Sequence, residues 1–234
     1  VAKRKLIKKA HRIVPWCPRC QTPLSSHELA QAYKITKDPA VYVKFRIIRG
    51  SPSTGSGQTS EFLLVWTTTP WTLPSNVAVA VNPKLTYTKY KIGDEFVWAH
   101  NMPPVVNGVQ PEAIEQISGE KMVGWIYEAL YDLNISKFKD LKGLSITNKN
   151  LKRFYKVLAA DFVGAEEGTG LVHIAPAFGE LDAQLIKKEW ELKPDEVPFT
   201  IDDAGKVLAG LPGEGKFIKS ADEDIVNDLA SRGL

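Results

Sequence analysis

The residue types in VWTTTPWTLPSN (residues 65–76) are unusual for an apolar stretch, because three threonines stand together in it. Strand alternation would place the hydroxyls of Thr67 and Thr69 on one face and that of Thr68 on the other. Each hydroxyl donates and accepts, so this segment could form a polar pocket wall that holds water or a sugar. The same residues also suit a strand end, because β-branched side chains favour extended backbone and Pro70 cannot donate to a ladder.

A second polar cluster lies in EEGTGLVHIAPAFGELD, residues 166–182. The pattern predicts a strand in which His173 shares a face with Leu171 and Ala175, followed by a helix with Asp182 in its first turn. A strand histidine is usually structural, and the helix dipole stabilises an acid in a first turn. No serine or cysteine stands beside the histidine as an obvious nucleophile.

The third candidate site is the pair Cys17 and Cys20 in WCPRC, and these are the two cysteines of the chain. A C-x-x-C spacing indicates metal or redox chemistry. A structural zinc site needs four ligands, and His11 and His27 are poorly spaced to complete one. We therefore expect zinc only at an incomplete structural site, metal-free or poorly occupied.

The elements that position these residues are mostly short strands with irregularly placed helices. Helices are predicted at 111–117, where the proline suits a first helical turn, and at 179–190, and a hairpin is predicted at 199–209. A last helix is predicted from a Ser220/Glu223 capping box, with a stop at Gly233. Strands are predicted at residues 41–48, 61–68, 76–81, 85–92, 95–99, 154–163 and 170–175. Such a pattern predicts an α+β fold, a β-barrel core with peripheral helices. Neither a G-x-G-x-x-G nor a P-loop sequence is present.

The composition is that of an ordinary globular protein of 234 residues, with 44% hydrophobic and 24% charged residues. Prolines and asparagines make the apolar stretch 62–83 a poor membrane span, so we expect a cytoplasmic protein without membrane contact. The net charge of +3 is uneven, because residues 1–27 hold seven basic side chains and no acid. This basic arm could contact phosphates, or it could be a solvated helix face.

Taken together, WTTTPWTLPSN and GTGLVHIAPAFGELD closely resemble the editing domain of isoleucyl-tRNA synthetases. The resemblance extends to WCPRCQTPLSSHELAQ, VYVKF, VAVAVNP and PGEGKFIKSADEDIVNDLASRGL, and so covers nearly the whole chain. The valyl and leucyl relatives carry T-T-R-P, whereas Thr69 fills that arginine position here. The resemblance implies an editing-domain fold over residues 41–234, with residues 1–40 as a basic arm and half zinc knuckle leading to a catalytic core.

The resemblance also implies an activity, namely hydrolysis of valine wrongly esterified to the 3′ end of tRNA(Ile), or of valyl-adenylate. Thr67 and Thr69 would hold the water and the terminal adenosine, and Asp182 would bind the α-ammonium group. His173 would border the side-chain pocket, acting in discrimination, in proton transfer, or in both. Thr68, Trp71 and Asn76 complete the substrate-binding residues that the resemblance implies.

Two further expectations follow from the resemblance. The family often has two adjacent acids after FGE, whereas Leu181 precedes Asp182 here, so a second carboxylate is missing. Editing needs no cofactor, and ATP belongs to the aminoacylating core, whose signatures are absent, so we expect a monomer that does not charge tRNA. The rival hypotheses are a free-standing editing factor and a non-catalytic basic RNA-binding module with a zinc-ribbon-like half site.

Overall fold

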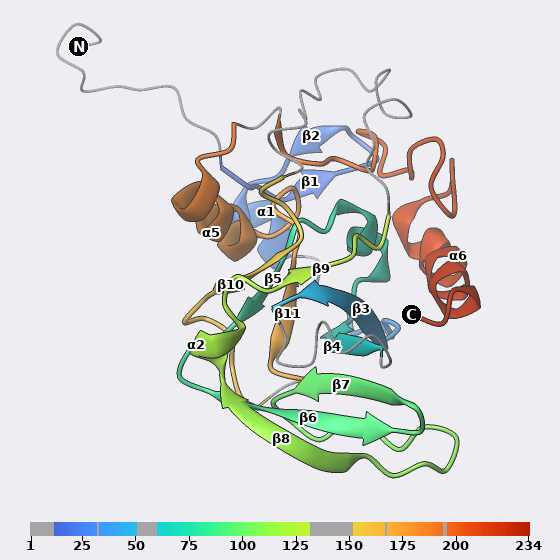
Figure 1. Cartoon of the computed structure of the whole chain (residues 1–234). Helices are drawn as coiled ribbons and strands as arrows, with labels where there is room; N and C mark the ends of the chain where they lie inside the picture. The colour runs from blue at the N-terminus through green and yellow to red at the C-terminus, as the bar shows by residue number, and fades with distance from the viewer. Residues whose placement is uncertain (1–11, 32, 51–59, 132–151, 167, 194–195) are drawn as a thin grey trace, which may run out of the picture.

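The computed structural model describes residues 12–31, 33–50, 60–131, 152–166, 168–193 and 196–234 (Figure 1). A curved sheet forms the body, with α5 and α6 on opposite sides of it and a small N-terminal unit at one end. The helical elements are α1 (Ser26–Ala30), the 3-10 helix η2 (Pro70–Ser75), α2 (Gly119–Met122), α5 (Glu180–Trp190) and α6 (Ile218–Ser231). The predicted basic arm falls largely in residues 1–11, outside the described residues.

Within the described residues, nine strands form one mixed sheet in the order β11-β5-β10-β9-β3-β4-β7-β6-β8. The strands are β3 (Val41–Arg49), β4 (Glu61–Thr67), β5 (Ala78–Val81), β6 (Thr86–Ile92), β7 (Glu95–Ala99), β8 (Glu112–Ser118), β9 (Ile126–Tyr127), β10 (Lys156–Ala159) and β11 (Leu171–Ile174). A separate pair, β1 (Trp16–Cys17) and β2 (Thr22–Pro23), belongs to the N-terminal unit. The α+β class is confirmed, and β3 pairs antiparallel with β4.

The predicted barrel is wrong, because the sheet is not closed. Its end strands β11 and β8 are not paired with each other, although β11 also packs against β4. Two pairings are parallel, β4 with β7 and β5 with β10, and each needs a crossover that a simple meander lacks. The antiparallel strands β6, β7 and β8 extend the sheet beyond β4 and keep its two edges apart (Figure 1).

Two local predictions were also wrong. Residues 111–117 are not a helix, because β8 pairs with β6 along its length, and a helix that short is marginal without tertiary support. The capping box of the last helix is not formed, because α6 begins at Ile218 and encloses Ser220. The stop at Gly233 fits its positive φ of 70°, which glycine adopts easily.

The other predictions hold in shorter form. The helix predicted at 179–190 is α5, and the strand predicted at 154–163 reduces to β10. The hairpin at 199–209 reduces to one bridge between Ile201 and Val207 around a tight turn. None of the helices in the described ranges is long and apolar enough to cross a membrane.

The strand β5, which lies next to the edge strand β11, is buried on both faces and separates two parts of the core. Val79 and Val81 pack into the larger cluster, whereas Ala78 and Ala80 pack into a smaller cluster beneath α5. The neighbouring strand β11 is antiparallel to β5 and pairs His173 with Val79. This register sets the face of the sheet on which His173 lies.

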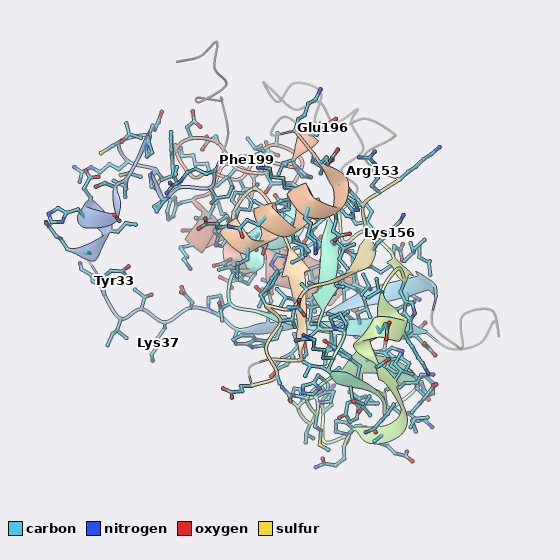
Figure 2. All side chains as sticks on the ribbon, turned by 90° about the vertical axis from the view of Figure 1, so that its left-hand side faces the viewer. Tyr33, Lys37, Arg153, Lys156, Glu196 and Phe199 are labelled. Carbon is cyan, nitrogen blue, oxygen red and sulfur yellow. The ribbon has the colours of Figure 1, made fainter. Side chains whose placement is uncertain are left out.

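Polar contacts join the N-terminal unit and the segment that follows it to the body. Residues 33–40 are extended, and Figure 2 shows Tyr33 and Lys37 projecting from this segment. The Trp16 indole donates to the carbonyl of Asp203 at 2.8 Å, and Lys219 pairs with Asp38 at 2.6 Å. The division at residue 40 stays a prediction.

Candidate functional site

A cavity of about 730 Å³ opens between the end of β4 and the strand β11. Its lining residues among those described are Trp66, Thr67, Thr68, Thr69, Gly164, Ala165, Glu166, Gly168, Thr169, Gly170, Leu171, Val172, His173 and Asp182. The cavity therefore brings together the three threonines, the histidine and the aspartate that the sequence predicts. These residues come from two segments far apart in the chain, and β4 and β11 pack against each other to join them.

The threonine segment is a strand end that turns into η2. Thr67 ends β4 and is buried, Thr68 is exposed, and Thr69 is the residue before the helix. The Thr67 and Thr69 hydroxyls are 3.3 Å apart, and the Thr69 hydroxyl lies 3.4 Å from that of Thr72. The strand-end and pocket-wall interpretations are both correct for this segment.

Thr72, which does not line the cavity, contacts His173 and was not predicted. Its hydroxyl donates to the Thr69 carbonyl at 2.8 Å, so it accepts from His173 Nε2, which lies 3.0 Å away. The imidazole therefore carries its proton on Nε2. The signal in the sequence was the spacing of three between Thr69 and Thr72, which aligns side chains on a 3-10 helix.

His173 is a buried neutral imidazole with one free nitrogen. Its Nδ1 atom is buried without a hydrogen-bond partner among the described residues. Burial lowers the pKa of the imidazole to about 4, because the charged form loses its hydration. At neutral pH, Nδ1 therefore presents an acceptor lone pair and no charge.

We expect the imidazole resonances of His173 to show an Nε2–H tautomer and to stay constant between about pH 5.5 and 8 in NMR spectra. The unfolded chain takes up this proton near pKa 6.5 and the folded chain only near about 4. The folded state should therefore lose stability as the pH falls from about 6.5 to about 4. A titration midpoint near 6.5 for His173 would contradict the buried position.

Asp182 lies in the first turn of α5, as predicted, and its carboxylate is bound to the preceding loop. Oδ2 accepts from the Ala175 N–H at 2.8 Å, and a Cβ added at Gly179 would lie 2.7 Å from the carboxyl carbon. Burial raises the pKa of this carboxyl, and the Ala175 hydrogen bond offsets part of that rise. The neighbouring Leu181 is exposed and is not among the residues of the cavity wall.

The G-T-G turn forms the other end of the cavity. Gly168 and Gly170 have φ of 62° and 70°, and added Cβ atoms would meet Trp66 at 2.9 Å and His100 at 2.4 Å. Thr169 between them is 2% exposed, and its hydroxyl has no partner among the described residues. Thr169 was not predicted as a site residue, although the G-T-G pattern around it is visible in the sequence.

We expect Thr169→Val to leave thermal stability unchanged or higher, because valine removes an unpaired buried hydroxyl. If that hydroxyl meets the ligand, ester hydrolysis should fall roughly threefold to tenfold. Thr200→Val is the matched control, because the buried Thr200 hydroxyl is paired with Ser75 at 2.7 Å. That variant should lose about 1–3 kcal/mol in a thermal melt and keep its activity per folded molecule. Destabilisation by Thr169→Val would assign its hydroxyl to the fold.

The charge of the cavity wall is negative. Glu166 and Asp182 contribute carboxylates, and no lysine or arginine occurs among the described lining residues. Glu166 was not predicted. Such a wall favours a cationic ammonium group over a phosphate.

Trp71 and Asn76, predicted to bind substrate, are not among the residues that line the cavity. Trp71 packs edge-on against Phe178 with ring centroids 4.8 Å apart. The Asn76 amide donates to the Ala78 carbonyl at 2.8 Å and accepts from the Tyr127 hydroxyl at 2.6 Å. Both side chains therefore contact residues outside the cavity lining.

Cys17 and Cys20 form a knuckle at the end of the β1–β2 pair. The Cys20 N–H points at the Cys17 sulfur at 3.4 Å, and hydrogen bonds from Cys20 lower the pKa of the Cys17 thiol. Within the described ranges, no three His, Cys, Asp or Glu side chains are grouped to hold a metal ion. Two sulfurs do not fit a four-ligand zinc site, so zinc binding here stays a prediction.

The fold is that of an aminoacyl-tRNA synthetase editing domain. It is similar to the structure titled GlLeuRS-CP1, with a TM-score of 0.54 at 15% identity over 83% of this chain and 97% of that one. It is also similar to the editing domain of P. knowlesi cytosolic leucyl-tRNA synthetase, with a TM-score of 0.54 at 11% identity over 85% of this chain and 95% of that one. No protein-family model matches the chain.

The chain is homologous over its full length to part of the isoleucine–tRNA ligases. It is 38% identical to isoleucine–tRNA ligase 2 of Bacillus cereus over 100% of this chain. It is 39% identical to isoleucine–tRNA ligase of Thermus thermophilus over 99% of this chain. The chain spans 20% of the length of each of these relatives. The resemblance stated from the motifs is confirmed.

Proposed function

We propose that this chain edits tRNA(Ile) by hydrolysing the ester bond of wrongly attached valine while sparing isoleucine. The observation that carries the proposal is the convergence of Thr67, Thr69, His173 and Asp182 in one cavity. Its volume of about 730 Å³ is large enough for an aminoacyl group and the adenosine that bears it. The chain would act as a monomer in the cytoplasm, on the 3′ end of the tRNA.

The negative wall selects an amino acid with a free α-ammonium group. Oδ2 of Asp182 accepts from the Ala175 N–H, and a carboxylate can accept several hydrogen bonds, so the group can also form a charge-assisted bond to the substrate. The same wall disfavours a phosphate within the cavity. This favours the tRNA ester over valyl-adenylate, whose phosphate joins the amino acid to the nucleoside.

The reaction needs an ordered water more than it needs a strong nucleophile. The water oxygen attacks the ester carbonyl carbon, the bond to the ribose oxygen breaks, and that oxygen leaves with a proton. The Thr67 and Thr69 hydroxyls lie close enough together to hold the water and an adenosine hydroxyl. Fixing these reactants supplies the rate by orientation, and free valine and tRNA are the products.

His173 is better suited to orient and discriminate than to remove a proton. A general base works best when its pKa lies near the operating pH, and the pKa of about 4 lies well below it. Nδ1 is buried, so the ring acts through its position in the wall. The buried ring also fills space that a larger side chain would need.

Steric rejection is the basis of the discrimination. One methylene of difference in an apolar pocket is worth only about 1–3 kcal/mol, so a second site that excludes the larger amino acid sharpens selection. Because Thr72 fixes the orientation of the His173 ring, this wall yields little to a larger side chain.

The direct test incubates the chain with valyl-tRNA(Ile) and isoleucyl-tRNA(Ile) and follows deacylation. We expect the valyl ester to be cleaved much faster than its spontaneous rate and the isoleucyl ester to stay near its own. Binding of both tRNAs without cleavage of either would favour the non-catalytic RNA-binding module. Equal cleavage of both esters would overturn the proposed specificity.

A further inference from the structure

We propose that Asp222, on the C-terminal helix α6, is a positioning residue for the site, because it holds the threonine turn that carries Thr69 and Thr72. The inference rests on the proposed function for its kinetic readout only. Asp222 is distant in the sequence from the residues that line the cavity, and it is not one of them. It contacts the site through the start of η2, against which α6 packs (Figure 1).

The start of η2 has one backbone donor that its own helix cannot satisfy. Pro70 has no N–H, and the Thr72 N–H donates to the Thr69 carbonyl at 3.0 Å. The Trp71 N–H therefore needs an acceptor from outside. Thr69 stands at the capping position, but its side chain makes no capping hydrogen bond.

Asp222 supplies that acceptor from the opposite side. Its Oδ1 atom accepts from the Trp71 N–H at 2.9 Å, and the residue is 4% exposed. The helix that carries it is fixed by Ala221, Ile225 and Leu229, which pack into the larger core cluster. The carboxylate is therefore held by a rigid element.

Asp222 and Thr69 therefore have different roles at the start of η2. An N-cap threonine normally uses its hydroxyl to accept from the first N–H groups of its helix. Because Asp222 takes that role, the Thr69 hydroxyl is free to join Thr67 and Thr72. The Thr72 hydroxyl in turn sets the His173 tautomer. Asp222 therefore acts on the imidazole indirectly, through the Trp71 N–H that it binds and the Thr72 hydroxyl that contacts His173.

The alternative explanation is that Asp222 only stabilises the fold. A buried carboxylate with its second oxygen unpaired among the described residues is a costly way to stabilise a fold. The nearby Lys219 is paired with Asp38 at 2.6 Å, so its charge is already shared with another carboxylate. The position of Asp222 is better explained by the geometry that it fixes at the start of η2.

The experiment compares Asp222→Ala and Asp222→Asn with the native chain, using Asp224→Asn as the control. Asp224 lies on the same helix and pairs with Lys216 at the surface, at 2.7 Å. Amide hydrogen exchange of Trp71, the ¹⁵N signature of His173 and single-turnover deacylation of valyl-tRNA(Ile) are measured for each. Thermal melts report stability separately.

We expect Asp222→Ala to raise Trp71 exchange, to mix the His173 tautomers and to lower the saturating deacylation rate roughly 10- to 100-fold, with half-saturation nearly unchanged. Asp222→Asn keeps an oxygen acceptor and should recover most of each property. Asp224→Asn should match the native chain.

Native His173 signals and rate in a less stable Asp222→Ala would overturn the inference and leave a structural role. If Asp222→Ala does not fold, Asp222→Asn still decides, because the proposal requires near-native His173 signals in it. The two spectroscopic readouts need no catalysis. A chain with no deacylase activity but with Asp222-dependent His173 signals would refute the proposed function and not the positioning.

Discussion

Asp182→Asn should lower deacylation of valyl-tRNA(Ile) about 10- to 100-fold, the largest effect that we expect from one isosteric change. The substitution removes the charge that binds the α-ammonium group, and a hydrogen bond between charged partners contributes about 1.5–3 kcal/mol. The fold should persist, because an amide oxygen can still accept from the Ala175 N–H, which Oδ2 now does at 2.8 Å. Asparagine is therefore a sharper test than alanine, which would also release that loop.

The substrate supplies the decisive control. Acetylation of the valyl α-amino group removes the positive charge, so the native chain should lose about the same factor on acetylvalyl-tRNA(Ile). The asparagine variant should cleave both substrates at nearly equal rates. Glu180→Gln is the matched protein control, since Glu180 is an exposed acid of the same helical turn that contacts Gln184. A variant that still prefers the free amino group would refute the role of Asp182.

The second large effect concerns discrimination and not rate. His173→Ala should open the wall that excludes isoleucine, and overpacking of a rigid pocket costs about 1–3 kcal/mol. The ratio of valyl to isoleucyl deacylation rates should therefore fall by about tenfold or more, through gained activity on isoleucyl-tRNA(Ile). Single-turnover rates on the two substrates measure this ratio.

Thr72→Val separates the shape of the ring from its orientation. It keeps the imidazole but removes the hydroxyl that lies 3.0 Å from Nε2, so the ring should lose its fixed tautomer while still filling the wall. We expect a smaller change in the ratio than for His173→Ala. If His173→Ala instead kept the native ratio at a reduced rate, His173 would be a catalytic group and not part of the discriminating wall.

The site residues were predicted from two motifs that together resemble a known family, because each motif alone suits a structural role as well. The structure places the Thr67–Thr69 segment, His173 and Asp182 around one cavity. Their supporting contacts were not predictable. The bond from Trp71 to Asp222 joins residues 151 positions apart, and no periodicity in either segment indicates it.

The fold shows the same division. Strands with clear alternation, such as β3, β6 and β7, were predicted within one or two residues. Residues 111–117 were misassigned to a helix because Pro111 suits a first helical turn, and only the pairing of β8 with β6 shows that they form a strand. Closure of the sheet depends on which strands meet, which strand patterns alone do not determine.

The register of β11 against β5 decides which face of the sheet carries His173. Side chains alternate across a strand, so shifting β11 by one position would put Val172 opposite Val79 and carry the imidazole to the face beneath α5. A shift by two would keep the face and move the imidazole by about 7 Å, away from Thr72. An odd insertion or deletion between the G-T-G turn and His173 would therefore invert the site without removing a single functional residue.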